Sequence, residues 1–222
     1  MGFKKRPMLF KYQVVFQKDM ITLSVVKRYC LSKKLLCMIN EILLKYARFT
    51  DDELDIIREK FSPLKMDKNE LFLDAGQICN RAGLIINGKF ILSQVSESGN
   101  EAILDFFITG ELISDYYSLL KNYPSKTYIK ALKKAELLVI TKKDLEYLYR
   151  TIPKFQIFGR KLAEESFIRL AETIKLQSVS PKERYQIFMA NKIEIIKEFP
   201  QYMIASYLRI SPEWLSKIRG HK

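Results

Sequence analysis

The sequence predicts an α+β fold, in which an antiparallel β-roll or barrel is followed by a long helix and a C-terminal helix-turn-helix. Three observations predict this fold. Short apolar segments separated by turn residues occupy the middle of the chain, from Pro63 to Ile140. A helical stretch with no internal proline then runs from Pro153 to about Ser178. The last segment, from Pro200 onward, has the apolar spacing of two short helices joined by a tight turn.

The first 37 residues have a net charge of +8 and no regular period, because lysine and arginine interrupt every apolar run. Two interpretations remain open. The segment is a basic arm that adds sequence-independent affinity for a polyanion such as nucleic acid, or it is not part of the natural protein and translation starts at Met38. We favour the second, because apolar residues such as Phe16 do not suit a solvated arm. In either case we expect a protein that begins at Met38 to fold.

A regular helical pattern begins at Met38. Ile39, Ile42 and Leu43 have the spacing of one helical face. The segment Thr50-Asp51-Asp52-Glu53 then has the sequence of a capping box. We therefore predict two helices before the first strand.

The strands are predicted from short segments rich in apolar and β-branched residues, with turn residues between them. Asn87-Gly88 directly follows one of these segments and predicts a tight hairpin to the next. Evenly spaced short strands of this kind are typical of a closed antiparallel roll or barrel. The predicted strands are Leu71–Leu73, Leu84–Ile86, Phe90–Val95, Ala102–Phe107, Tyr128–Leu132 and Leu137–Ile140.

Two helices are predicted after the strands. Thr141 and Asp144 have capping-box-like spacing at the start of a short helix that ends near Tyr149. In the long stretch after Pro153, apolar residues recur at alternating steps of four and three, which suits the seam of a two-stranded coiled coil. The predicted seam, and hence the dimer interface, consists of Ala163, Phe167, Leu170 and Ile174. The alternative is a single helix buried inside a monomer.

The C-terminal segment has the apolar skeleton of a helix-turn-helix. Its inward positions are Ile204, Ala205, Leu208, Ile210, Leu215 and Ile218. Ser211 suits the N-cap of the second helix and Pro212 its first position. Arg209 stands at a turn position that requires a positive φ and usually has glycine. For a residue with a side chain, this conformation costs about 1 kcal/mol.

Composition narrows the class of function. The net charge of +13 indicates a polyanionic partner, either nucleic acid or an anionic membrane surface. No run of about 18 uncharged apolar residues occurs, so we expect no membrane span. The three cysteines lack CxxC spacing, as is typical of a reduced, cytoplasmic protein. With His221 as its single histidine, the chain has too few ligands for a zinc site, an iron–sulfur cluster or a haem, and no nucleophile–base pair.

Three segments resemble the CRP/FNR superfamily of transcription regulators, in its Bacteroidetes type. These are the terminal IASYLRISPEWLSKIR, the upstream SPKERYQIF, and the stretch from FFITGELISDYYSLL to LLVITKKDL. The resemblance covers roughly residues 40–220. It implies a cyclic-nucleotide-binding-like jelly roll, a central dimerisation helix and a winged-helix DNA-binding domain, in which any wing would have to lie before the recognition helix. The domains are then 1–37 (basic extension), 38–152 (sensor), 153–178 (dimerisation helix) and 179–222 (helix-turn-helix).

The resemblance also implies which residues bind DNA. The recognition helix, 212–219, would enter the major groove, with Glu213 and Lys217 reading base edges. Ser216 and Arg219 would contact phosphate, and Ser211 completes the expected DNA-binding set. Lys217 stands where the family usually has arginine, so a two-pronged guanine contact is lost. Trp214 is expected to pack against a neighbouring helix.

The effector site implied by the resemblance is incomplete. Members that bind cyclic nucleotides have a Gly-Glu, whose glutamate binds the ribose, and a later Arg-Ser that neutralises the phosphate. Gly110-Glu111 is present, but Ser125-Lys126 stands at the Arg-Ser position. Without the arginine the planar, two-pronged donor is missing. We therefore expect no cyclic AMP effector, no iron–sulfur cluster and no haem, and we leave the effector unassigned.

We thus expect a cytoplasmic, homodimeric, non-enzymatic transcription regulator that binds a palindromic duplex, since two recognition helices about one helical turn apart need two half-sites. RNA polymerase is a further expected partner. The alternative is a cyclic-nucleotide-type sensor that acts through a protein partner and has a degenerate DNA-binding domain. Salt-dependent binding to a palindromic duplex would discriminate between the two.

Overall fold

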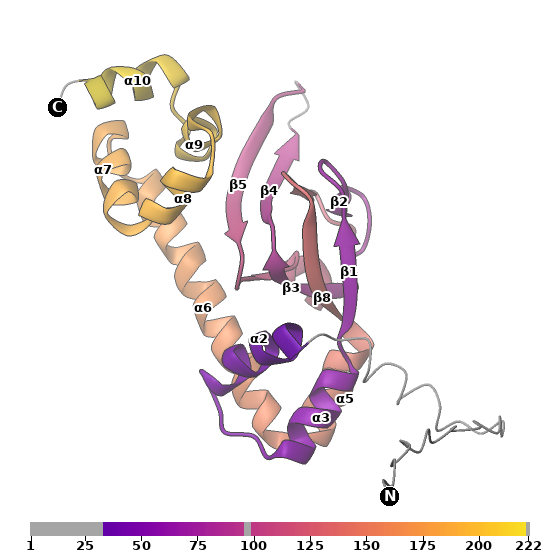
Figure 1. Cartoon of the computed structure of the whole chain (residues 1–222). Coiled ribbons are helices and arrows are strands. Elements are labelled where there is room, and N and C mark those ends of the chain that lie inside the picture. Colours follow the sequence, from indigo (N-terminus) through magenta and orange to yellow (C-terminus); the bar gives the residue numbers. More distant parts are fainter. Residues whose placement is uncertain (1–32, 96–98, 221–222) are drawn as a thin grey trace, which may run out of the picture.

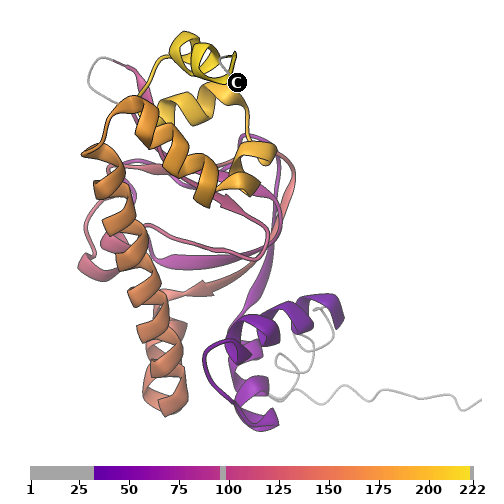
Figure 2. The ribbon, with the colours of Figure 1, turned by 90° about the vertical axis from the view of Figure 1, so that its left-hand side faces the viewer.

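The computed structural model describes residues 33–95 and 99–220. In this part of the chain, two helices precede a β-roll of two antiparallel sheets, and further helices follow it (Figure 1). The long helix α6 (Pro153–Gln177) lies alongside the roll, with the N-terminal helices near its first turns and the C-terminal helices at its end (Figures 1 and 2). The predicted α+β fold, with a roll, a long helix and a helical C-terminal part, is confirmed.

Two helices, α2 (Lys33–Leu44) and α3 (Asp51–Glu59), form the described N-terminal part. The predicted capping box is confirmed: the Glu53 N–H donates to the Thr50 hydroxyl at 3.3 Å, and the Thr50 N–H donates to the Glu53 carboxylate at 2.8 Å. Helix α2 begins at Lys33, earlier than the predicted start at Met38. The prediction was too late because Lys33 and Lys34 interrupt the apolar pattern on which it relied. Residues 1–32 of the predicted extension lie outside the described residues.

The roll consists of two four-stranded antiparallel sheets. One has the strand order β1-β8-β3-β6 and the other β2-β7-β4-β5. Buried side chains such as Ile85, Phe90 and Leu137 fill the space between them. The strands are β1 (Ser62–Met66), β2 (Leu71–Leu73), β3 (Arg81–Asn87), β4 (Lys89–Val95), β5 (Glu101–Ile108), β6 (Leu112–Ile113), β7 (Tyr128–Ala131) and β8 (Ala135–Thr141).

The hairpin predicted at Asn87-Gly88 is wrong. Strand β3 pairs with β6 and β8, whereas β4 pairs with β5 and β7, so these two residues lead the chain from one sheet to the other. Glycine is needed there because of a close approach: a Cβ at Gly88 would lie 2.8 Å from the Ala135 Cβ. The predicted type I′ turn, which needs a positive φ at both residues, does not form either, because only Gly88 of the pair has one.

Three short elements were not predicted: β1, β6 and helix α4 (Tyr116–Lys121). In the sequence, Pro63 indicates that its segment is not a strand. The structure nevertheless places β1 at the edge of its sheet, where proline is tolerated. Helix α4 is capped by Asp115, whose carboxylate accepts a 3.0 Å hydrogen bond from the Ser118 N–H. Elements this short give little periodic signal.

The roll leads into α5 (Lys142–Thr151) and then α6. The predicted start at Thr141 is confirmed, since the Asp144 N–H donates to its hydroxyl at 3.1 Å. The first turns of α6 share a core with α2, α3, α5 and the outer face of β3 and β8, in which Phe155 and Phe158 are buried. This core fixes one end of the long helix to the roll.

Four helices follow: α7 (Pro181–Asn191), α8 (Ile193–Glu198), α9 (Gln201–Leu208) and α10 (Pro212–Gly220). The wing implied by the resemblance is not seen, since residues 142–220 form no strand and α8 occupies the segment where a wing would have to lie.

The C-terminal helices pack against the outer face of β4 and β5. Phe106 of β5 lies against Phe199 and Tyr207, with ring centroids 4.6 and 5.4 Å away. Polar contacts border this core: the Ile103 N–H of β5, the edge strand of its sheet, donates to the Ser206 hydroxyl of α9 at 3.1 Å. The C-terminal helices are thus docked on the sheet through a shared apolar core.

Candidate nucleic-acid interface and effector region

The turn between α9 and α10 has the geometry of a helix-turn-helix. Arg209 has φ 53° and ψ 46°, so the predicted positive φ at this residue is confirmed. The Ile210 N–H donates to the Ala205 carbonyl at 3.0 Å, which satisfies a carbonyl at the end of α9. A residue with a side chain in this conformation costs about 1 kcal/mol, which the surrounding packing has to offset.

The apolar skeleton of the two helices is buried as predicted. Ile204, Ala205 and Leu208 of α9 and Leu215 of α10 are each at most 1% exposed. Ala205 is small where the two helices approach closely, and Ile218 packs on the same core. The orientation of α10 is therefore set by its inner face, and its outer face is left to solvent.

The outer face of α10 presents the predicted base-reading residues. Glu213, Ser216 and Lys217 are exposed, whereas Trp214 is half-buried. The backbone of Arg219 lies in α10, but its side chain lies outside the described residues. The helix N-terminus and the Ser211 hydroxyl lower the pKa of Glu213, so this carboxylate is charged at neutral pH.

The predicted N-cap at Ser211 is confirmed. Its hydroxyl accepts a 3.1 Å hydrogen bond from the Trp214 N–H, as an N-cap does. Together with Pro212 at the next position, it fixes where α10 begins. The single proton of the hydroxyl serves the Glu213 carboxylate, whose pKa the hydroxyl lowers.

Arg184 joins three segments, and sequence reasoning did not single it out. Its guanidinium donates to the carbonyls of Leu176 at the end of α6 (2.7 Å), Val179 in the linker (3.2 Å) and Leu208 at the end of α9 (2.6 Å). The residue lies in the quoted SPKERYQIF segment, so that segment was the available signal. The arrangement holds the end of the long helix against the helix-turn-helix.

The predicted seam on α6 is exposed in the single chain. Phe167, Leu170 and Ile174 are 71%, 58% and 60% exposed, and Ala163 is half-buried. A helix buried inside a monomer would not leave three large apolar side chains on its surface. The alternative that the helix is buried within one chain therefore does not describe this face of α6.

The predicted effector residue Glu111 is held by the long helix. One carboxylate oxygen accepts from Nη2 of Arg169 on α6 at 2.8 Å, and the other accepts from the Ile108 N–H at 2.8 Å. Arg169 also donates to the Asp105 carboxylate at 3.0 Å. Burial opposes the charge of Arg169, but the two carboxylates outweigh it and raise its pKa. The preceding Gly110 has φ +93°, which only glycine adopts readily.

Ser125 and Lys126 serve a different part of the roll. Ser125 is buried, and its hydroxyl lies 2.6 Å from an Asp115 carboxylate oxygen and accepts from the Thr127 N–H at 3.0 Å. Asp115 in turn caps α4, so this cluster closes a turn of the backbone. Lys126 is exposed. The position where the family has its phosphate-binding arginine thus holds a serine bonded to a carboxylate.

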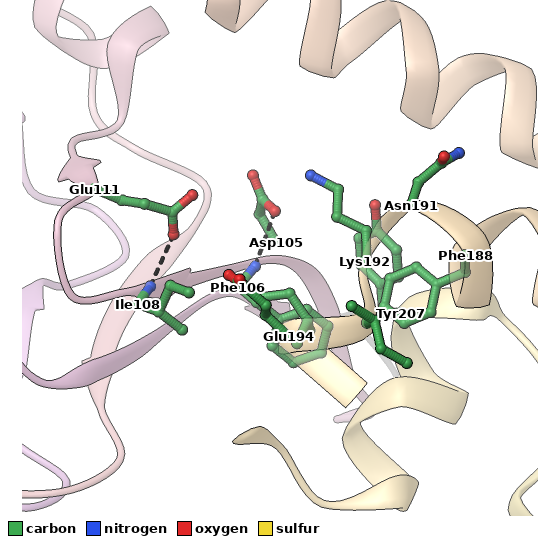
Figure 3. A pocket seen from close by; sticks show the side chains of 11 residues that line it. Asp105, Phe106, Ile108, Glu111, Phe188, Asn191, Lys192, Glu194 and Tyr207 are labelled. Carbon is green, nitrogen blue, oxygen red and sulfur yellow. Dashed lines mark hydrogen bonds between the residues drawn. The ribbon is translucent and has the colours of Figure 1, made fainter. Parts of the chain in front are cut away.

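A cavity of about 380 Å³ lies between the roll and the C-terminal helices (Figure 3). It is lined by β5 and the loop that follows it, by the junction of α7 and α8, and by Tyr207 of α9. Glu111 lines this cavity, but Ser125 and Lys126 do not. The structure therefore does not gather the four predicted effector residues around one cavity.

Residues 63–151 match the cyclic nucleotide-binding domain family. Over 198 residues the chain is 24% identical to the anaerobic regulatory protein of Haemophilus influenzae, with 83% of this chain and 76% of that protein covered.

Solved structures share the fold. FixK2 from Bradyrhizobium japonicum superposes with a TM-score of 0.60 at 14% identity, covering 72% of this chain and 83% of that one. The catabolite activator protein of Thermus thermophilus superposes with a TM-score of 0.52 at 18% identity, covering 81% and 85%. Among the described residues, no helix combines the length and the apolar character that crossing a membrane requires.

Proposed function

We propose that the chain is a CRP/FNR-type regulator with a cyclic nucleotide-binding domain and that it binds specific duplex DNA as a homodimer. The observation that carries the proposal is the outer face of α10, where Glu213, Ser216 and Lys217 are exposed on a helix whose inner face is buried. An α-helix fits the major groove of DNA, where such side chains reach base edges. The curated relatives of the chain are named anaerobic regulatory proteins.

Each exposed side chain of α10 has a distinct chemical role in the proposal. The Glu213 carboxylate accepts from the amino group of cytosine, and the Lys217 ammonium donates to guanine. Ser216 and Arg219 bind phosphate and set the register of the helix without reading sequence. The charge on Glu213 excludes phosphate as its partner, which leaves a base edge.

Dimerisation completes the DNA interface. The exposed Phe167, Leu170 and Ile174 follow one another along α6 at heptad spacing, and a second copy of the same face would bury all three. A twofold dimer places two α10 helices on successive turns of one duplex face, which matches a palindromic site.

We further propose that the protein does not use cyclic AMP as an effector. Glu111, the residue that would bind the ribose, is already paired with Arg169. At the phosphate position Ser125 is buried beside a carboxylate, which repels a phosphate. The direct Arg169–Glu111 pair joins the roll to the dimer helix without a nucleotide between them. No iron–sulfur cluster or haem is part of the proposal.

The test is a selection of duplexes from a random library, followed by a salt titration on the selected site. We expect a palindromic consensus, with affinity that falls steeply as salt rises, because each protein dimer releases counterions from several phosphates. Binding that selects no consensus, or the absence of duplex binding at low salt, would instead favour a sensor that acts through a protein partner.

A further inference from the structure

Helix α4 and the residues just after it present an apolar face that the described part of the chain leaves uncovered. This α4 face consists of Tyr117, Leu120 and Tyr123, which are 65%, 58% and 59% exposed. The other side of α4 is buried through Ser118 and Leu119. Single apolar residues are normal on a protein surface, whereas a cluster of large ones marks an interaction site.

The α4 face lies on one flank of the predicted seam of α6. Burial raises the pKa of Tyr149, and the nearby hydroxyl of Tyr116 on α4 raises it further, so the two tyrosines are close. The Tyr149 hydroxyl in turn fills the space beside Gly159 of α6, since a Cβ at this glycine would lie 2.6 Å from it. When Ala163 and Leu170 are d positions of the heptad, Gly159 is a g position. The α4 face therefore borders the seam on its g side.

The opposite flank of α6 is also apolar and exposed. This e flank consists of Ile157 and Ile168, which are 41% and 55% exposed and occupy e and b positions of the same heptad. It is bordered by the end of α2, whose Lys45 donates to Glu165 of α6 at 3.1 Å. A two-stranded coiled coil needs an apolar stripe only at a and d positions. The apolar surface of α6 is thus wider than a partner helix alone covers.

The seam by itself is small for a stable dimer. If a fully exposed large side chain offers about 200 Å², then Phe167, Leu170 and Ile174 offer roughly 400 Å² per subunit at their observed exposure. A standard stable interface buries about 800 Å² per partner. The α4 face and the e flank raise the total to roughly 900 Å² by the same measure. A dimer that covers all three surfaces therefore reaches the usual size.

We propose that the α4 face is part of the dimer interface and that it covers the e flank of α6 in the second copy of the chain. In a parallel coiled coil, the g side of each helix faces the e side of the other. A twofold axis along the two helices therefore places α4 of each copy against the e flank of the other, and the contact occurs twice. The two exposed surfaces outside the seam then cover each other.

This proposal rests on the proposed homodimer and adds a second contact to it. The seam joins α6 to α6, whereas the α4 contact joins the roll of one copy to the long helix of the other. The position of each roll is then fixed relative to both long helices. Because the contact involves two different surfaces, its loss can be measured separately from the loss of the seam.

The first test is the dissociation of the full-length protein on dilution, followed by sedimentation velocity. Tyr117→Lys should raise the dissociation constant of the dimer at least about tenfold, because it removes a buried aromatic side chain from two contacts per dimer. Tyr202→Lys makes the same change at a similarly exposed tyrosine of α9 and should leave the constant unchanged. Circular dichroism shows whether both variants are folded.

Crosslinking between subunits identifies the contact. One sample of the full-length protein carries Leu120→Cys, and a second carries Ile157→Cys or Ile168→Cys. The samples are mixed, allowed to exchange subunits and treated with a short bismaleimide. We expect a crosslinked dimer from at least one of the two mixtures and little from any sample alone, because a twofold axis along α6 keeps the two copies of each surface on opposite sides of the dimer.

The crosslinking needs a background and two controls. Cys30 and Cys37 are replaced by serine in every sample, and the buried Cys79 is kept. Leu170→Cys alone should crosslink, because a d position of the seam faces its own copy. Leu120→Cys mixed with Tyr202→Cys should not.

Two results would overturn the α4 contact and leave the homodimer standing. In the first, Leu170→Cys crosslinks while neither mixture does. In the second, the Tyr117→Lys dimer is as tight as the unmodified one. Either result points to a different protein as the occupant of the α4 face. An unmodified chain that is monomeric, with no crosslink through Leu170→Cys, refutes the proposed homodimer and the α4 contact with it.

Discussion

The guanidinium of Arg184 donates a 2.6 Å hydrogen bond to the main-chain carbonyl of Leu208, the last residue of α9. The same guanidinium donates to the carbonyl of Leu176 at the end of α6. A single side chain thus sets the position of the helix-turn-helix relative to the seam, and in a dimer the distance between two recognition helices depends on that position.

We therefore expect Arg184→Lys to weaken specific DNA binding at least about tenfold. Lysine keeps the charge, but it lacks the planar fork that bonds three carbonyls at once. Each hydrogen bond to a charged group contributes about 1.5–3 kcal/mol. Fluorescence anisotropy on the selected duplex measures the loss, with Lys182→Met on the exposed side of α7 as the control. Unchanged affinity would show that the linkage is not needed to place the reader helix.

On the reader helix, Glu213→Ala and Lys217→Ala should each cost about 1–3 kcal/mol of binding free energy on the specific site and relax base preference at one position. Arg219→Ala should weaken binding to all sequences evenly. Glu183→Ala, an exposed acidic position on α7, is the matched control for Glu213. If the selected consensus is the same for both reader variants, α10 is not the element that reads the groove.

On the long helix, Leu170→Lys should give a monomer that has lost specific DNA binding, since an unpaired charge would be buried in the apolar seam. Glu172→Lys makes the same residue type at an exposed position two residues further along and should stay dimeric. Sedimentation velocity distinguishes the two states. An unmodified chain that is already monomeric at micromolar concentration would contradict the assignment of the seam.

Cyclic AMP should give no measurable heat on titration, because Arg169 occupies Glu111 and a buried serine stands at the phosphate position. The Glu111→Gln variant serves as the reference. Micromolar binding of cyclic AMP that disappears in this variant would mean that the nucleotide displaces Arg169 and that the roll retains its nucleotide site.

The link between α3 and α6 should depend on pH. The Thr50 N–H and the Lys154 ammonium lower the pKa of Glu53 in the folded state. The stability that the Glu53 carboxylate contributes is therefore fully present above its unfolded pKa of about 4.3, and it is lost as pH falls through its folded-state pKa. Glu53→Gln should lower the melting temperature at neutral pH and not in strong acid. Glu146→Gln, at an exposed position of α5, should have no such pH-dependent effect.

Local rules predicted the parts of the fold that local chemistry determines. The Thr50 and Thr141 caps, the limits of α6 and the positive φ of Arg209 depend on residues near one another in sequence, and all four were found as predicted. Strand pairing depends on distant residues. At Asn87-Gly88 the turn chemistry is the same whether the next strand pairs back or crosses to the other sheet, and the sequence does not distinguish the two.

Glu111 was predicted, but its partners were missed for the same reason. Arg169 lies on α6 and Asp105 on β5, and the three residues meet only once the roll and α6 are packed together. In the sequence, Arg169 is the single basic residue between the seam positions Ala163 and Ile174, and nothing near it in the sequence indicates its partners. The seam repeats along one helix and is therefore visible as a pattern in the sequence. An ion pair between different elements produces no such pattern.

The bond between the Ser206 hydroxyl and the Ile103 N–H has a consequence for solubility. Strand β5 ends its sheet, and an open strand edge beside apolar side chains is a template for pairing with another chain. Helix α9 covers that edge and the adjacent Phe106. Any movement that frees the C-terminal helices uncovers the edge, so their docked arrangement also protects the protein against edge-to-edge aggregation.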